Sequence, residues 1–515
     1  MKTNILSSII ILLIVGCNPQ AYRLVNRISV DPQDHKLLHP SSPFLKTHMK
    51  DGTVYVFDKW EIFKQYDDLG KEMTLVIGDG TLLSINRNIL KQGQFKVPID
   101  SIVIMETNKL TKSGSVTAMT LVTGLSLFGT GLCALNPKAC FGSCPTFYVN
   151  DGNNNIVQAE GFSSSIAPSL EATDIDMLYH ASNSDEIFQV EMKNEAYETH
   201  VIDYVDLLLF PKSDEERIFF EGNDIFWKTN EIISPYSCSI NHEDCLNKIN
   251  KMDDLEWYSV TDSFNLAKKE IIEIEFNNIK EGDYGLIIGA RQSLLSTFIF
   301  YQALSYMGKN VGEWLAMTER GEIPHGEIFN VLGGIEILIQ NEKGKWIKWD
   351  EMKEMGPIAT DIHMIKLPAF SQSSKSIKLR LAKGNWRINY IALASLNEKL
   401  EPIVLKPSSV YYDSKYDDEA LNMLSISKEK LVTLPGDVYT INYEIPSNEL
   451  GYEYFLKSRG YYLEWIRDSW IEEENLSLLV QMNFRPKKTL KDLAPIYKEI
   501  EANMENVFWN SKYEK

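Results

Sequence analysis

Positive charge is scarce in this sequence. Its 515 residues include 52 Lys and Arg against 71 Asp and Glu, which gives a formal net charge of −19. A chain of this charge is repelled by phosphate backbones and by anionic lipid headgroups. The composition therefore excludes nucleic acid as a partner.

Hydrolase motifs are also missing. The chain contains neither G-x-S-x-G nor H-E-x-x-H, and its eight His occur in unrelated contexts. No internal repeat is present, and no sequence motif indicates a cofactor. We therefore predict no cofactor, and a binding protein is better supported than an enzyme.

An apolar stretch at the N-terminus is too short to span a bilayer. Lys2 precedes the run from Ile5 to Val15, whereas a transmembrane helix needs roughly 20 apolar residues. The run ends in Ile14-Val15-Gly16-Cys17, which resembles the lipobox of bacterial lipoproteins. The resemblance implies that a signal peptide is removed and that Cys17 carries lipid, so the partner is a membrane in the cell envelope. Because Asn18 and not Asp follows Cys17, the expected location is the outer membrane.

The other five Cys form two clusters, and the envelope is an oxidising compartment in which close pairs form disulfides. Cys238 and Cys245 are the first expected pair. Cys140 and Cys144 are the second, which leaves Cys133 unpaired, and a Cys133–Cys140 bridge is the competing choice. Sequence does not decide between them.

Most of the chain has the period of β-strands. Hydrophobic residues make up 44% of it, and apolar and polar positions alternate over 335–339, 377–381 and 386–390. Residues 292–307 instead show a broad apolar helical face. Asp-Gly at 79–80 predicts a hairpin turn. We predict a mainly β, multi-domain α+β protein, and its central part is similar to jelly-roll carbohydrate-binding modules in architecture.

At 515 residues the chain exceeds one hydrophobic core. The predicted organisation is a signal peptide (1–16), a lipidated N-terminus and tether (17–50), a small β domain (51–145), a β domain (146–255), a β-sandwich with a helical insertion (256–400) and a C-terminal β/α segment with a helix (401–515).

The segment from Ser113 to Pro137 carries no charge. It is long enough to span a bilayer, and its glycines would permit close helix packing. It is also rich in Ser and Thr, which favours a buried or hairpin segment of the folded body. Both interpretations stay open at this point.

Three short motifs give a second resemblance. They are Cys144-Pro-Thr-Phe-Tyr148, Leu170-Glu-Ala-Thr-Asp174 and Asn194-Glu195 followed by Glu198-Thr199 and Asp203. In this order they resemble exported bacterial proteins of no established activity, over roughly residues 140–210. The resemblance implies a β-rich envelope protein and carries no activity.

The third motif also concentrates polar side chains. It contains Asn194, Glu195, Glu198, His200 and Asp203, and strand spacing places Glu198 and His200 on one face. Such a set suits either a metal site or a hydrogen-bonded structural network, and the network is the preferred interpretation.

The spacing Cys140-x-x-x-Cys144-Pro145 is similar to that of copper-handling thioredoxin-like proteins, in which two thiolates hold copper. No βαβ pattern surrounds it here. A structural disulfide is the preferred interpretation.

Aromatic residues in two segments are candidates for stacking on sugars, although a core position is the preferred interpretation for aromatic residues in strands. They are Trp346 and Trp349 in one segment, and Tyr461, Tyr462 and Trp465 in the other. The leading hypothesis is a non-enzymatic envelope lipoprotein acting as an interaction or assembly module. The alternatives are a surface glycan-binding or glycan-hydrolysing lipoprotein, and a copper or redox protein using Cys140 and Cys144. Exposed coplanar aromatics or two facing carboxylates in one cleft would favour a glycan.

Overall fold

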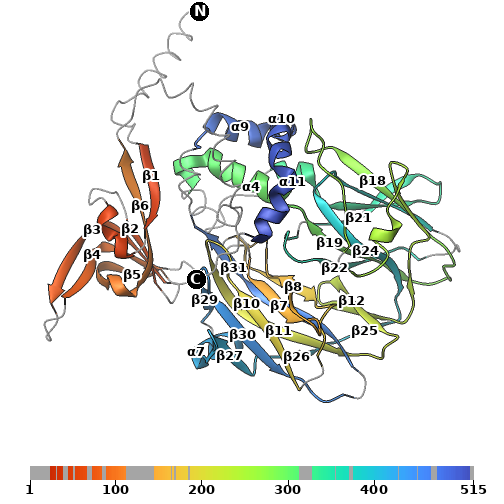
Figure 1. Ribbon diagram of the computed structural model, residues 1–515, viewed down its shortest axis with the longest axis horizontal. Helices are drawn as coiled ribbons and strands as arrows, with labels where there is room; N and C mark the ends of the chain where they lie inside the picture. Colours follow the sequence, from red (N-terminus) through yellow and green to blue (C-terminus); the bar gives the residue numbers. More distant parts are fainter. Residues whose placement is uncertain are drawn as a thin grey trace, which may run out of the picture. The chain divides into compact units, whose positions relative to one another are not determined.

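Figure 1 shows the computed structural model of the chain. The structure describes residues 24–30, 32–38, 45–49, 53–66, 72–83, 89–111, 144–163, 165–166, 170–183, 186–253, 255–311, 327–353, 355–369, 375–426, 429–448, 451–465 and 473–510. The predicted signal peptide, Cys17, the uncharged segment 113–137, Cys133 and Cys140 lie outside the described residues. Among the described residues, no helix combines the length and the apolar character needed to cross a membrane.

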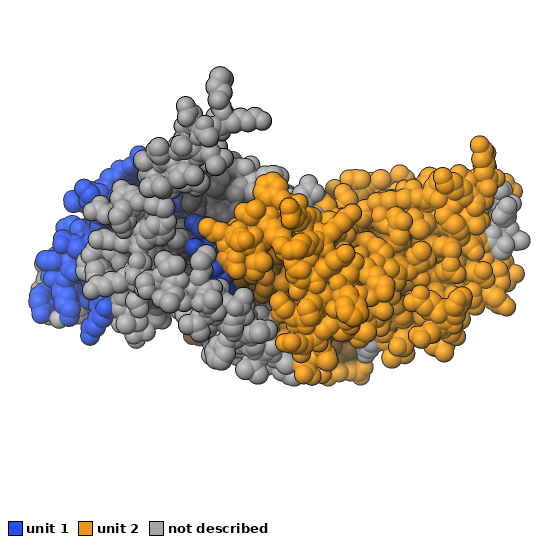
Figure 2. Space-filling view, turned by 90° about the horizontal axis from the view of Figure 1, so that it is seen from above, with its two compact units in different colours: residues 1–128, 307–312, 466–474 blue, residues 129–306, 313–465, 475–515 orange. Residues whose placement is uncertain are grey.

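The chain divides into two compact units, which Figure 2 distinguishes by colour. Unit 1 comprises residues 1–128, 307–312 and 466–474, and unit 2 comprises the rest.

The described part of unit 1 forms an antiparallel sheet with the strand order β1-β6-β2-β3-β4-β5. Its strands are β1 (Leu24–Val30), β2 (Leu45–Met49), β3 (Val54–Tyr66), β4 (Glu72–Leu83), β5 (Ile89–Pro98) and β6 (Ile102–Thr111), and short 3-10 helices cover Pro32–Leu37 and Ile99–Ser101.

The predicted tether is wrong over residues 24–30 and 45–49, because these residues form β1 and β2. Leu45 of β2 is fully buried and pairs with Phe57 of β3, which is also fully buried. Leu45, Thr47 and Met49 alternate with polar Lys46 and His48, and this period of two specifies a strand. The scattered prolines concealed that alternation.

The predicted hairpin turn at Gly78-Asp79-Gly80 is also wrong, since β4 runs straight through it. Asp58 forms a β-bulge in β3, because Phe57 pairs with Gly80 and Lys59 with Asp79. A Cβ atom on Gly78 would lie 2.1 Å from the carbonyl oxygen of Lys59. Glycine is therefore required here by the close approach of two strands and not by a turn.

The described residues of unit 2 form four larger antiparallel sheets, which we number I to IV. Sheet I contains β7 (Thr146–Asn150), β8 (Asn155–Glu160), β10 (Ile187–Lys193), β27 (Ser409–Tyr412), β28 (Lys415–Tyr416) and β30 (Val438–Glu444). Sheet II contains β9 (Ala172–Met177), β11 (Glu198–Pro211), β26 (Ile403–Leu405), β29 (Leu431–Thr433) and β31 (Tyr452–Glu464).

Sheet III contains β14 (Ile232–Ile233), β17 (Trp257–Tyr258), β19 (Tyr284–Gln292), β22 (Asp361–Lys366) and β24 (Trp386–Ser395). Sheet IV contains β15 (Ser237–Ile240), β16 (Glu243–Asp244), β18 (Lys269–Phe276), β20 (Ile335–Gln340), β21 (Trp346–Met352) and β23 (Lys375–Ala382). A small sheet joins β12 (Arg217–Gly222), β13 (Ile225–Thr229) and β25 (Glu398–Leu400).

The four sheets stack in order, with one apolar core between each neighbouring pair. In β11, Leu207 and Leu209 belong to the core shared with sheet I, whereas Leu208 and Phe210 belong to the core shared with sheet III. In β24, Ile391 and Leu393 likewise face sheet IV, while Ala392 and Ala394 face sheet II. Successive side chains of a strand point to opposite faces, so both central sheets are apolar on both faces.

The predicted β-rich α+β class is confirmed, but the structure differs from the predicted domain boundaries. The sandwich of sheets III and IV begins at β14, well before residue 256, and β26 to β31 return to the sandwich of sheets I and II. Sheets I and II are therefore built from two segments far apart in the sequence. Sequence periodicity identifies strands but not which distant strands pair.

Helices gather at one end of unit 2 (Figure 1). They are α4 (Leu294–Met307), α6 (Glu327–Leu332), α9 (Leu476–Phe484), α10 (Pro486–Asp492) and α11 (Ala494–Asn510), while α7 (Asp418–Ser425) packs on β11 and β27. The predicted helix over 292–307 is confirmed. Phe298 of α4 contacts Tyr497 of α11 with ring centroids 5.0 Å apart.

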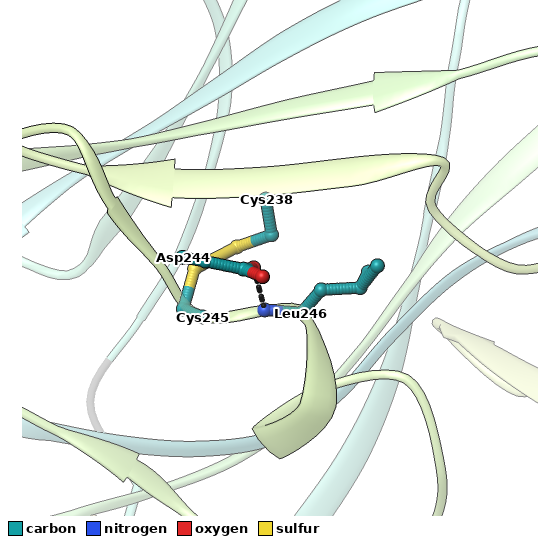
Figure 3. The surroundings of a disulfide bond; sticks show 4 residues. All are labelled: Cys238, Asp244, Cys245 and Leu246. Atoms are coloured by element: carbon teal, nitrogen blue, oxygen red, sulfur yellow. Dashed lines mark hydrogen bonds between the residues drawn. A yellow bond between two sulfur atoms is a disulfide. The ribbon is translucent and has the colours of Figure 1, made fainter.

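The disulfide predicted between Cys238 and Cys245 is present (Figure 3). The two Cα atoms are 5.4 Å apart, and both cysteines are buried in the core between sheets III and IV. Asp244 accepts a hydrogen bond of 2.9 Å from the backbone N–H of Leu246, which fixes the chain directly after the bridge.

Removing this bridge is expected to destabilise unit 2. Closing so short a loop constrains the unfolded chain by about 2–3 kcal/mol, so Cys238→Ala/Cys245→Ala should lower the free energy of unfolding by that amount. Urea denaturation measures it. Reductant should destabilise the parent protein and leave the double variant unchanged; an equal response of both proteins would contradict the assignment.

Candidate functional site

The five polar residues singled out from the sequence do not converge on one point. Asn194 donates hydrogen bonds to the backbone oxygens of Glu198 (3.0 Å) and Thr433 (3.3 Å). Glu195 accepts hydrogen bonds from the hydroxyls of Tyr148 (3.0 Å) and Thr146 (3.2 Å). These bonds connect β7, the end of β10 and β29 inside the fold.

Glu198 and His200 do lie on one face of β11, as the strand spacing predicts. The Nε2 atom of His200 is 3.1 Å from a carboxylate oxygen of Glu198, and His200 has no exposed surface. Asp203 occupies a β-bulge in β11 and pairs with Arg459 at 3.5 Å, so it does not join them. Within the described ranges, no three His, Cys, Asp or Glu side chains are arranged to hold a metal ion.

The buried position of these residues decides their role. Asn194, Glu195, Glu198 and His200 are each at least 96% buried, so no ligand reaches them from solvent. Buried polar groups require hydrogen-bond partners, and the bonds above supply them to the Asn194 amide, to the Glu195 carboxylate, and to one carboxylate oxygen of Glu198 and one ring nitrogen of His200. The set is therefore a structural network, which was the preferred interpretation.

The prediction of a Cys140–Cys144 disulfide is wrong, because Cys144 is a buried free thiol. Burial raises the pKa of this thiol well above its usual range, and the carboxylates of Glu160 and Glu198 raise it further. Since the thiolate is the metal ligand and the nucleophile, this environment opposes copper binding or redox chemistry at Cys144.

Glu160 is the centre of a buried acidic cluster beside Cys144. Its carboxylate accepts a hydrogen bond of 2.7 Å from the backbone N–H of Ile358, and a Cβ atom on Gly356 would lie 2.0 Å from the carboxylate carbon. Burial raises the pKa of Glu160 to about 7. Burial together with the charge of Asp361 raises the pKa of Asp174 to about 6.

An open polar cleft of about 340 Å³ lies elsewhere in unit 2, between the β12–β13 hairpin and the neighbouring strands β21 and β22. Its residues come from three segments, which are the hairpin (Glu221, Gly222, Asn223 and Ile225), β21 (Trp349 and Asp350) and β22 (Met364, Ile365 and Lys366).

Trp349 is the large aromatic side chain of this cleft. Ile337 of β20 pairs with Asp350 and Leu338 pairs with Lys348, so Trp349 is the extra residue of a β-bulge on an edge strand. Such bulges redirect a side chain away from the regular pleat. The indole N–H donates a 2.9 Å hydrogen bond to the backbone oxygen of Lys366, and 44% of the residue stays exposed.

The hairpin supplies the opposite wall. Gly222, Asn223 and Asp224 have positive φ angles of 106°, 51° and 57°, the backbone region that Gly and Asn tolerate best. The ammonium of Lys457 in β31 lies 2.8 Å from a carboxylate oxygen of Asp224, and this ion pair connects the turn to sheet II. The hairpin thus presents Asn223 at the rim of the cleft.

Two carboxylates line the cleft, and each has one oxygen fixed by a neighbour. One oxygen of Glu221 accepts a 2.6 Å hydrogen bond from the indole N–H of Trp227, and one oxygen of Asp350 accepts a 2.8 Å bond from the backbone N–H of Glu351. The Lys366 ammonium lies 5.2 Å from the centre of the Trp227 ring. The cleft therefore combines an aromatic surface with oriented acceptors and a cation.

The sequence indicated Trp349 on one side of this cleft but gave no indication of the β12–β13 hairpin on the other side. Trp349 was named as a sugar-stacking candidate, but Trp346 is covered by the Lys378 ammonium, 4.7 Å from its ring centre. In the second aromatic segment, Tyr461 and Tyr462 are buried, as the preferred core interpretation predicts, and Trp465 donates to the hydroxyl of Thr199. The turn residues 222–224 were the signal that could have located the hairpin wall.

No known protein family matches the chain, and no curated protein resembles it in sequence. Among solved structures, an allantoicase from Saccharomyces cerevisiae is similar at 9% identity and a TM-score of 0.18, over 42% of this chain and 79% of that one. A second allantoicase structure matches at 10% identity and a TM-score of 0.18, over 55% of this chain and 100% of that one. At these TM-scores neither similarity carries a functional argument.

Proposed function

We propose that the protein is a non-catalytic binding module of the bacterial cell envelope that holds a glycan in the Trp349 cleft. The observation that carries the proposal is the half-exposed indole of Trp349, oriented by a β-bulge and by its bond to Lys366 inside a polar cleft. A flat aromatic surface that is already held in place loses little conformational entropy on binding.

The chemistry of the cleft matches that of a sugar ring. One face of a pyranose consists of C–H groups, which pack on the electron-rich face of an indole. Sugar hydroxyls donate to carboxylates and accept from ammonium and amide groups. Glu221, Asp350, Asn223 and Lys366 supply these groups around Trp349.

A glycan screen with the full chain tests the proposal. We expect saturable binding to one class of glycan, and competition by the free oligosaccharide of that class. Binding that survives every competing sugar, or no binding across envelope and host glycans, would overturn the assignment. An envelope protein would then be the remaining class of partner.

The two carboxylates of the cleft favour hydrolysis of the bound glycan as a second candidate, since glycosidases use a carboxylate pair. Release of reducing ends from the best glycan in the screen distinguishes the two functions. Binding without release supports the module. Release that disappears in Glu221→Gln and Asp350→Asn would establish the enzyme.

The envelope location rests on the lipobox-like end of the leader at Cys17. Several acyl chains anchor a protein far more firmly than one, because each buried CH₂ contributes about 0.8 kcal/mol. Metabolic labelling with an alkyne fatty acid should mark the protein, and Cys17→Ser should abolish the label. An unlabelled protein that stays in the cytosol would contradict the location without affecting the cleft.

A further inference from the structure

Helix α9 in unit 2 has an apolar stripe on its exposed side. Leu476, Val480 and Phe484 follow one another at intervals of four residues, which places them on one face. They are 48%, 55% and 82% exposed. The opposite side of the helix is already covered, because Met482 is buried and α9 packs against α6 and α10. The stripe is therefore not needed for the local core.

The helix is held in this orientation by its own cap and by the next helix. The side chain of Asn475 accepts a 3.1 Å hydrogen bond from the backbone N–H of Leu478, which is an N-cap. Gln481 donates a 2.8 Å bond to Asp492 at the end of α10. The stripe thus lies on a fixed surface and not on a loop.

Positive charge is concentrated beside the stripe. Arg485, Lys487, Lys488 and Lys491 follow within seven residues, all exposed, and the carboxylate that accompanies them in α10 is Asp492, which lies 3.3 Å from Lys488. The whole chain carries −19, and these four cations gather at the C-terminal end of α9 and along α10, whereas Glu473 and Glu474 precede the first turn of α9. Long Lys and Arg side chains next to an apolar face are the pattern of helices that rest in a membrane interface.

We propose that α9 and α10 form a second membrane contact, in which Leu476, Val480 and Phe484 insert between anionic lipid headgroups that the four cations neutralise. Charge complementarity selects a lipid surface over an apolar protein groove, because a protein groove would have to supply four compensating carboxylates at matching positions. The contact is independent of the Trp349 cleft and of acylation at Cys17. It would bring unit 2 onto the membrane surface.

Site-specific photocrosslinking tests this contact. Benzoylphenylalanine in place of Phe484 of the full chain is irradiated with vesicles of phosphatidylglycerol and phosphatidylethanolamine. The matched control carries the same group in place of Phe264, which is also 82% exposed in unit 2. We expect crosslinks to lipid at 484 and not at 264, and their loss when phosphatidylcholine replaces the anionic lipid.

A charge-matched pair of variants completes the test. Each cation near an anionic surface contributes about fivefold to binding, so Lys487→Gln/Lys491→Gln should lower the crosslinking yield at 484 by at least about tenfold. Lys343→Gln/Lys345→Gln removes the same charge from exposed lysines elsewhere and should leave the yield unchanged. Equal yields at 484 and 264, crosslinks from 484 to protein, or equal losses in both lysine variants would each overturn the proposal.

Discussion

Trp349→Ala is expected to weaken glycan binding by about thirtyfold or more, because truncating an aromatic anchor at the centre of a binding site typically costs about 2 kcal/mol or more. The indole provides the apolar surface of the cleft, and the surrounding acceptors orient a sugar that is already stacked. Trp349→Phe should give an intermediate affinity, since it keeps a ring but loses the hydrogen bond to Lys366. Titration calorimetry with the best glycan from the screen measures both effects.

Trp346→Ala is the matched control for this prediction. It removes the same side chain from the same edge strand, but its ring lies under Lys378 and outside the cleft lining. Its affinity should equal that of the parent protein. Because Trp349 is exposed in a bulge, Trp349→Ala should also unfold at nearly the parent urea concentration, as surface variants do. Equal affinities of the two alanine variants would show that the glycan binds elsewhere.

The strands of unit 2 were predictable because their signal is local. Ile335, Ile337 and Ile339 alternate with other residues in sequence, and the same three side chains enter the core between sheets III and IV. A strand with one buried face must show this period of two, whatever pairs with it. Predictions from this alternation were wrong in two strands. In β2, nearby prolines suggested a tether, and in β4, two glycines suggested a turn.

Pairing between distant segments was not predictable by the same means. Sheet II joins β11 to β31 over a separation of more than two hundred residues, and nothing in either strand specifies the other. The Cys238–Cys245 bridge was predictable because its loop is short. Cys144 was misjudged because its thiol fits a buried space beside Glu160, which depends on β8 and on the loop around Gly356.

The candidate site likewise includes one residue that the sequence could identify and several features that depend on the fold. Trp349 was identifiable as an aromatic residue in a strand, but its exposure follows from a bulge opposite Ile337 and Leu338. Glu221 and Asn223 are far from Trp349 in sequence and meet it because the β12–β13 hairpin packs beside β22. The sequence of a polar turn does not show which cleft its residues will line. The five polar residues of 194–203 were conspicuous in sequence because they are clustered there, yet their partners lie mainly within the fold.

The free energy of unfolding is expected to fall by about 3 kcal/mol between pH 4.5 and pH 7 because of Glu160 alone. Burial raises the pKa of this carboxyl from 4.5 to about 7, and every tenfold change in an acid dissociation constant corresponds to roughly 1.4 kcal/mol. The folded protein therefore holds a proton that the unfolded chain has released. Stability is fully present below pH 4.5 and is lost as the pH rises through 7. Burial raises the pKa of Asp174 and Asp176 as well, so they act in the same direction.

Glu160→Gln isolates the contribution of Glu160 to the pH dependence of stability from the contributions of other residues. The amide imitates the protonated acid and cannot ionise. Urea unfolding at pH 5 and at pH 8 should show a markedly smaller loss of stability in this variant than in the parent protein. Glu453→Gln is the matched control: Glu453 is also buried, but Arg217 binds its carboxylate at 2.7 Å. That variant should be less stable at both pH values while keeping the parent's difference between them. If Glu160→Gln retained the full difference, the buried proton would have to reside on another group, and the apolar burial of Glu160 could not be the cause of the pH dependence.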